Sequence, residues 1–246
     1  MVAMSEFKVS LPTSGGPMAV HGFLPESPGA GPLPGIILLQ EAFGVNPHMR
    51  RLGQRMAALG YAVFCPELFH RGGDGLEFGY DEFPKIKPLM GTLTNAHIAE
   101  DLHAVHAHML GRPDVDGSRI ASWGFCLGGW ASVLAACELP IAAAVSFYGG
   151  GLVRERPGIG FTPLVDRLGS VGCPLLLVFG GHDASIPPED IAVLDRRLTS
   201  LGKAHEVEVY PDGGHGFFCE DRSAYHSASA QAAWSRATTW LEVRLG

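Results

Sequence analysis

The 246-residue sequence predicts an α/β fold, in which a mostly parallel, twisted sheet carries helices on both faces. Short apolar segments alternate along the chain with longer segments of helical composition. The stretch 35–40 is almost continuously apolar, as expected of a central parallel strand that is buried on both faces. Neither a linker nor an internal repeat divides the chain, so we expect one domain over residues 1–246.

Local patterns predict the elements in chain order. Two short strands at 7–11 and 18–24 flank a turn and predict an opening hairpin. Asn46 and Pro47 supply an N-cap and a first-turn proline for a helix that runs to about Leu59. Further strands are expected at 61–65, 119–123, 141–147, 174–179 and 206–210, and further helices at 96–110, 130–137, 188–200 and 223–245. The segment 70–90 mixes glycine, proline and charge without a period, so we expect a long loop or a small cap there.

Composition argues against several classes of protein. A net charge of −7 makes a nucleic acid or an anionic membrane surface an unsuitable partner. The sequence contains no apolar run long enough to span a membrane, and residues 1–6 lack the basic and apolar regions of a secretory leader. Its five cysteines are scattered and form neither a metal knuckle nor a disulfide framework, which indicates free thiols and a cytoplasmic protein.

The pentapeptide Gly124-Phe125-Cys126-Leu127-Gly128 is the most informative motif. It lies between an apolar run and a helix-forming stretch, which is the strand–turn–helix context of a nucleophile elbow with cysteine as the central residue. Small neighbours permit so sharp a turn, and the following helix N-terminus favours the thiolate form of Cys126. The alternative interpretation is a buried cysteine beside a glycine-rich packing contact.

Two further residues complete a candidate catalytic triad. Asp183 and His215 each follow a predicted strand and stand beside glycines, in the chain order nucleophile, acid, histidine. Parallel strands gather such residues at one edge of the sheet, where α/β proteins build their sites. Taken singly, a loop aspartate is commonly a turn former and a loop histidine a surface residue. Their shared placement favours a triad of Cys126, His215 and Asp183.

The segment Gln40-Glu41-Ala42 follows the strand at 35–40 and supplies the remaining parts of an acyl-transfer site. Such a site needs two backbone N–H donors for the developing oxyanion, and we expect them from Leu127 and Ala42. Glu41 is then a carboxylate at the mouth of the site, or else an exposed acid at a strand end. Tyr148, at the end of another strand, lines the pocket or packs in the core.

The chain resembles the dienelactone hydrolase family (carboxymethylenebutenolidases) of the α/β-hydrolase superfamily. The matching segments are 40–46, 66–69, 124–129, 147–149, 181–183 and 214–217, and they span most of the chain. The resemblance implies an α/β-hydrolase fold, a Cys126–His215–Asp183 triad, and Glu41 as the group that helps to convert the thiol to thiolate. It also implies hydrolysis of an activated ester or lactone through a thioester, with no cofactor.

The sequence departs from the family where the substrate carboxylate is held. Family members that act on dienelactone use an arginine four residues after the histidine, where this chain has Cys219. They use another arginine in the segment after the fourth strand, where 72–89 contains only lysines. Arg71 and Arg222 are the nearby substitutes. We therefore expect simple esters or another lactone to be hydrolysed at least as well as dienelactone.

Other functions remain open at this stage. Cys126 in a low-pKa environment also suits a non-catalytic, oxidant-sensing thiol protein, and the same residues suit a thiol peptidase or acyltransferase. Four histidines at 97–108 show no metal-ligand pattern and indicate a solvated helix face, so we expect no metal. The expected partner is a small ester or lactone, and the sequence favours neither a monomer nor a homodimer.

Overall fold

A central sheet organises the molecule, and the computed structural model describes residues 4–26 and 31–246 of it. Residues 1–3, part of the segment considered for a leader, lie outside the described residues. The strands of the sheet are β1 (Met4–Thr13), β2 (Gly16–Pro25), β3 (Leu33–Leu39), β4 (Ala62–Pro66), β5 (Val115–Phe125), β6 (Ala143–Phe147), β7 (Leu175–Gly180) and β8 (His205–Tyr210). Their spatial order is β1-β2-β4-β3-β5-β6-β7-β8.

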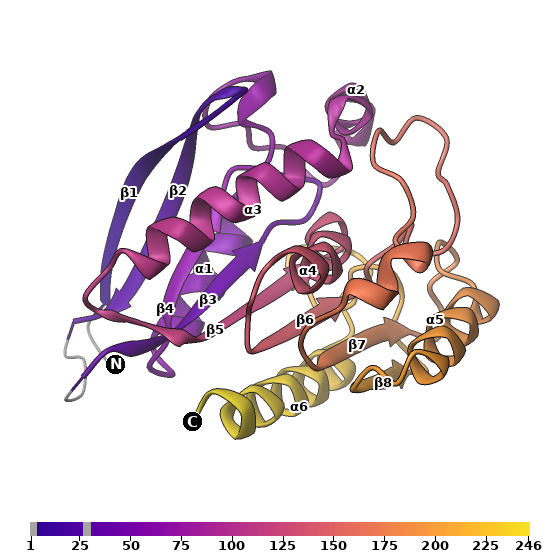
Figure 1. Ribbon diagram of the computed structural model, residues 1–246. Helices are drawn as coiled ribbons and strands as arrows, with labels where there is room; N and C mark the ends of the chain where they lie inside the picture. The colour runs from indigo at the N-terminus through magenta and orange to yellow at the C-terminus, as the bar shows by residue number, and fades with distance from the viewer. Residues whose placement is uncertain (1–3, 27–30) are drawn as a thin grey trace.

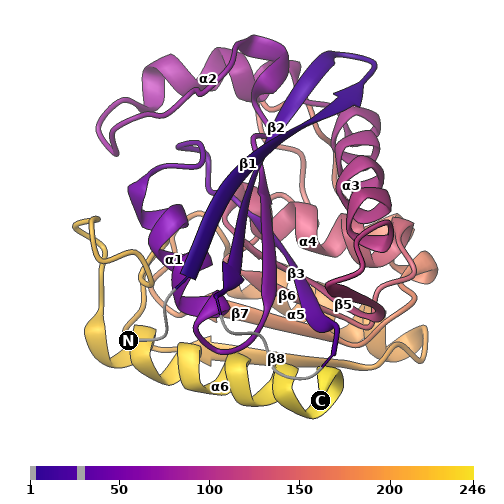
Figure 2. The ribbon, with the colours of Figure 1, turned by 90° about the vertical axis from the view of Figure 1, so that its left-hand side faces the viewer.

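The sheet is mostly parallel, as the sequence predicts. The opening hairpin pairs β1 with β2, and β2 pairs antiparallel with β4. From β4 to β8 every neighbouring pair is parallel. Strands change direction progressively across the sheet, which gives it a pronounced twist (Figure 2).

Helices cover both faces of this sheet. They are α1 (Pro47–Ala57), α2 (Phe83–Thr92), α3 (Asn95–Leu110), α4 (Leu127–Glu138), α5 (Pro188–Ser200) and α6 (Ser227–Leu245), with short 3₁₀ turns η1 (His70–Gly72) and η2 (Val165–Ser170). α3 and α4 lie on one face, and α1 and α6 lie on the other (Figures 1 and 2). The strands β4, β6 and β7 are buried along their whole length, as expected when both faces are covered. Among the described residues, every helix is too short or too polar to cross a lipid bilayer.

The main difference from expectation is α2, which occupies the segment expected to form a loop or cap. Pro84 stands in its first turn, where a missing N–H costs nothing, and Pro88 lies inside the helix. Ile86 and Met90 are buried one turn apart, so tertiary packing stabilises a helix that its composition disfavours. Smaller differences lie at element ends: β5 begins at Val115, and α6 begins at Ser227.

Candidate active site

Cys126 sits in a strained turn between β5 and α4. Its φ of 55° and ψ of −111° are unusual for a residue with a side chain. Glycine is required on both sides: a Cβ at Gly124 would lie 1.9 Å from the Gly128 carbonyl oxygen, and a Cβ at Gly128 would lie 2.1 Å from that of Leu39. The expected strand–turn–helix context is therefore present, with Cys126 at the N-cap of α4.

The three residues of the candidate triad come together from the ends of three parallel strands. Cys126 follows β5, Asp183 follows β7 and His215 follows β8. His215 Nε2 is 3.2 Å from Cys126 Sγ, which is close enough for direct proton transfer between them. His215 Nδ1 is 2.7 Å from Asp183 Oδ2. This leaves Nε2, the ring nitrogen beside sulfur, to exchange a proton with the thiol.

Electrostatics at this contact favour a thiolate beside an imidazolium. Burial opposes ionisation of the Cys126 thiol, but the adjacent His215 ring outweighs it and lowers the pKa of the thiol. Burial likewise opposes protonation of His215, but the Cys126 sulfur and the hydrogen bond with Asp183 raise the pKa of the ring. Despite burial, hydrogen bonds from His215 and Ser185 lower the pKa of Asp183. The site therefore stabilises charge separation between sulfur and ring.

Ser185 belongs to this network, although the sequence did not indicate it. Its hydroxyl donates to Asp183 Oδ1 at 2.6 Å and lies 3.1 Å from His215 Nδ1. Its backbone N–H also donates to Asp183 Oδ1, at 2.8 Å. The aspartate is therefore held by a local turn as well as by the histidine. The spacing Asp183-x-Ser185 is the only sequence signal, and it is common in ordinary turns.

The predicted oxyanion donors lie beside the thiol. Ala42 and Leu127 line the same cavity as Cys126. Among the described residues, neither of their backbone N–H groups has a hydrogen-bond acceptor. The Gln40 side chain holds the loop that carries Ala42 in place. It donates to the Glu41 carbonyl at 3.1 Å and accepts from the Leu68 N–H at 3.0 Å.

Glu41 is buried rather than exposed at a strand end. Its carboxyl Oε1 accepts a hydrogen bond from Arg222 Nη1 at 3.1 Å, while Oε2 has no partner among the described residues. Burial raises the pKa of this carboxyl, although the charges of Arg222 and His215 act to lower it. Tyr148 is fully buried, with its ring centroid 5.3 Å from that of His215. Arg222 therefore packs against Glu41, and Tyr148 packs against His215.

The cavity over Cys126 has a volume of about 340 Å³. Its floor contains Cys126, Leu127, Ala42 and His215, and its walls come from α2 and from the 150–161 loop. Five wall residues are apolar: Phe83, Met90, Pro157, Ile159 and Phe161. An apolar, concave space with a few polar groups at its floor is typical of a small-molecule site.

Arg71 lies away from this cavity. Its guanidinium donates to both carboxylate oxygens of Asp101, at 2.9 and 2.8 Å, and to Glu100 at 2.8 Å. None of the three residues expected to bind substrate, Arg71, Arg222 and Tyr148, lines the cavity. Besides His215, the basic residues in the described lining are Lys87 and Arg156, and no sequence motif marks either of them.

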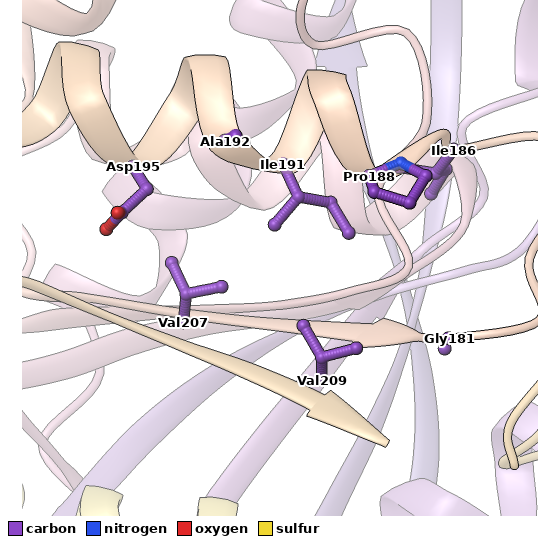
Figure 3. A pocket seen from close by; sticks show the side chains of 9 residues that line it. Gly181, Ile186, Pro188, Ile191, Ala192, Asp195, Val207 and Val209 are labelled. Carbon is purple, nitrogen blue, oxygen red and sulfur yellow. The ribbon is translucent and has the colours of Figure 1, made fainter. Parts of the chain in front are cut away.

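A larger cavity of about 420 Å³ lies between α5 and β8. Figure 3 shows Ile191 of α5 facing Val207 and Val209 of β8 across it. Among the described residues that line it, Asp195 is the one titratable group, and no nucleophile or histidine accompanies it. This cavity lacks the groups for acyl transfer. It is therefore a poorer candidate for the active site than the cavity over Cys126, despite its larger volume.

One group of potential metal ligands lies outside both cavities. A ligand atom from each of His48, Cys219 and Asp221 lies within 4.8 Å of the others. Asp221 bonds to Arg51 at 2.5 Å, and the Cys219 thiol donates to the Tyr80 hydroxyl at 3.0 Å. Burial raises the pKa of the Cys219 thiol to about 11, so a proton remains on the sulfur at neutral pH. These contacts occupy two of the three groups that a metal ion would need, the carboxylate and the thiol.

Comparisons with known proteins agree with this geometry. The model of the dienelactone hydrolase family matches residues 19–245. A Synechocystis protein, provisionally named carboxymethylenebutenolidase, is 32% identical over 93% of this chain and 93% of its own. An Escherichia coli K12 protein with the same provisional name is 34% identical over 95% of this chain and 85% of its own. A crystal structure from Klebsiella pneumoniae, provisionally titled dienelactone hydrolase, superposes with a TM-score of 0.89 at 33% identity. The match covers 98% of this chain and 99% of that one. This chain therefore belongs to the dienelactone hydrolase family.

Proposed function

We propose that this protein is a cysteine-dependent hydrolase of an activated ester or lactone. The observation that carries the proposal is the chain of contacts from Cys126 through His215 to Asp183 at the floor of an apolar cavity. A nucleophile, an oriented base and a site for the carbonyl carbon are the minimum for acyl transfer. We further propose that the whole chain acts as one domain, in the cytoplasm and without a cofactor.

The reaction proceeds in two halves. The Cys126 thiolate attacks the carbonyl carbon, and the Leu127 and Ala42 N–H groups stabilise the resulting oxyanion. Collapse breaks the carbon–oxygen bond of the ester, and the His215 imidazolium gives its proton to the leaving oxygen. A water molecule then attacks the thioester, with His215 as the base that takes its proton. Collapse of this second intermediate breaks the carbon–sulfur bond, which releases the acid and restores the Cys126 thiolate beside the His215 imidazolium.

Glu41 is a second acceptor for the thiol proton. Burial raises the pKa of its carboxyl, and Oε2 has no partner among the described residues, so this oxygen can take up a proton. Arg222 holds the other oxygen at 3.1 Å. The charge of Glu41 opposes ionisation of Cys126, so protonation of the carboxyl stabilises the thiolate.

The geometry favours hydrolysis over oxidant sensing. A sensing thiol needs a low pKa and access to oxidant, but it needs no histidine oriented by a carboxylate. Here the histidine is fixed on one side by Asp183 and Ser185, so Nε2 is directed at sulfur. Hydrolysis of a thioester uses this arrangement, because the base must activate water after the first product has left.

A hydrolysis screen with lactones and p-nitrophenyl esters tests the proposal. Cys126→Ala should lower kcat/KM by at least about a thousandfold, because the proposed acyl-enzyme forms on the Cys126 sulfur. Cys137→Ala is the matched control, since that half-buried thiol donates to the Arg167 carbonyl and does not line the cavity. In His215→Ala, intact-mass spectrometry should detect the acyl group on Cys126. Equal activity of Cys126→Ala and the parent protein would refute the proposal.

A further inference from the structure

The strand β8 ends the sheet and is open along its outer side. Its neighbour on the inner side is β7, and no strand of the described chain lies beyond it. Every residue of β7 is buried, whereas none of the six residues of β8 is, and Val209 remains 47% exposed. An uncovered edge strand is a template on which another strand can pair.

The backbone of β8 directs alternate residues to the two sides of the strand. The carbonyls of Ala204 and Tyr210 accept hydrogen bonds from the two ends of the β7 segment, at 3.0 and 2.7 Å. Even-numbered positions therefore face β7, and the N–H and C=O groups of His205, Val207 and Val209 point outward. Among the described residues, these outward groups have no hydrogen-bond partner.

The three outward positions are spaced symmetrically about Val207. A second copy, placed antiparallel about a two-fold axis at Val207, puts this valine opposite its own counterpart. The same operation puts His205 opposite Val209 of the second copy. In an antiparallel ladder each such opposed pair exchanges two N–H···O bonds. The edge is therefore complementary to itself, which a two-fold interface requires.

Apolar side chains on this edge support the same pairing. Val207 and Val209 face Ile191 across the cavity between α5 and β8 (Figure 3). Opposed side chains of an antiparallel pair lie on the same face of the sheet. The valines of a second copy would therefore continue this apolar strip and cover the exposed Val209.

The opposite face of β8 carries charge that is balanced within each copy. Arg236 donates to the carboxylates of both Glu206 and Glu208, and Arg244 donates to Glu206 at 3.1 Å. The pairing brings Glu206 opposite Glu208 of the second copy, but each copy supplies two guanidiniums for its two carboxylates. The protein as a whole has a net charge of −7, so this neutral strip lets two copies approach without an excess of one sign.

We propose that two copies of this chain pair along β8, about a two-fold axis at Val207, so that one sheet runs through both. The interface is independent of the proposed hydrolase function, because the described residues that line the cavity over Cys126 include none from β8. A strand of another protein would use the same backbone groups. The symmetry about Val207 and the neutral strip favour a second copy instead.

Sedimentation velocity between about 1 and 100 µM tests the proposal, and the parent protein should form a dimer. Val207→Lys and Val207→Glu each place like charges opposite one another at the axis, so each should raise the dimer Kd at least about a hundredfold. An equal mixture of the two variants should form a dimer again, because the lysine of one faces the glutamate of the other. Val243→Lys is the matched control, since this valine of α6 is 78% exposed and lies outside β8. Far-UV circular dichroism shows whether each variant folds.

Hydrogen exchange tests the pairing without any substitution. At high concentration the amides of His205, Val207 and Val209 should exchange slowly, and dilution should accelerate them. The amides of Glu206 and Glu208, which face β7, should stay protected at every concentration. A parent that is monomeric throughout, or a parent dimer that folded Val207→Lys leaves intact, overturns the proposal. Exchange of the outward amides that does not depend on concentration also overturns it.

Discussion

Ionisation of Cys126 depends on one neighbouring ring. Burial raises the pKa of the thiols of Cys65 and Cys173, whereas at Cys126 the effect of His215 overcomes it. In His215→Ala the burial of the thiol is no longer opposed by the ring, so we expect the pKa of Cys126 to rise. Alkylation by iodoacetamide, followed against pH on the peptide that contains Cys126, measures this pKa. An unshifted profile would contradict the contact seen at 3.2 Å.

Ser185 should act as a positioning residue. Its hydroxyl stabilises the Asp183 carboxylate and touches His215, so Ser185→Ala should lower kcat by about fivefold, which corresponds to about 1 kcal/mol. Ser185→Thr keeps the hydroxyl and should recover most of the rate. Thermal unfolding serves as the control. A fall in kcat that matches loss of folded protein in both variants would reduce Ser185 to a structural role.

Glu41→Gln separates the charge of this side chain from its shape. A neutral amide cannot accept the thiol proton, so turnover should fall while the melting temperature stays close to that of the parent. Steady-state kinetics and thermal unfolding on the same preparation give both values. Unchanged kcat together with unchanged thiol reactivity would make Glu41 a bystander.

The residues predicted from sequence are those that leave a local signature. Cys126, Asp183 and His215 each stand beside glycines just after an apolar strand, so their meeting at one sheet edge follows from topology. Lys87 and Arg156 carry no such signature. Arg156 lies in an irregular loop and Lys87 on a helix that the sequence did not predict, and only folding brings them to one cavity. Arg71 is close in sequence to the segment that binds the substrate carboxylate in the family. In the structure, however, Asp101 and Glu100 hold it away from the cavity over Cys126.

At the scale of elements, the turn from β5 into α4 tolerates no bulk. Gly128→Ala would place a Cβ 2.1 Å from the Leu39 carbonyl oxygen, so β3 and α4 must separate. We expect a loss of at least about 2 kcal/mol in stability and a larger loss of activity. Gly169→Ala is the matched control, because a Cβ there meets open space. Urea unfolding of both variants measures the difference, and equal midpoints would mean that the backbone relaxes freely.

The strands and most helices were predictable because their signals are local. Apolar runs flanked by glycine and proline mark β3, β4 and β7, and Asn46 with Pro47 marks the start of α1. The helix α2 has two prolines and no helical period, and the packing of side chains such as Ile86 and Met90 against the core stabilises it. Helices that depend on tertiary contacts leave little trace in composition.

At the scale of the whole molecule, we expect neither stability nor activity to depend on a metal ion. His48, Cys219 and Asp221 come within 4.8 Å of one another, but the carboxylate is paired with Arg51 and the thiol bonds to Tyr80. Burial also lowers the pKa of His48 to about 4, which leaves a neutral ring among three arginines whose charge repels a cation. Excess EDTA should therefore leave kcat/KM and the melting temperature unchanged, and added Zn²⁺ should not raise the melting temperature. Loss of activity in EDTA that zinc restores in the parent, but not in His48→Ala, would show that these three residues hold an ion after all.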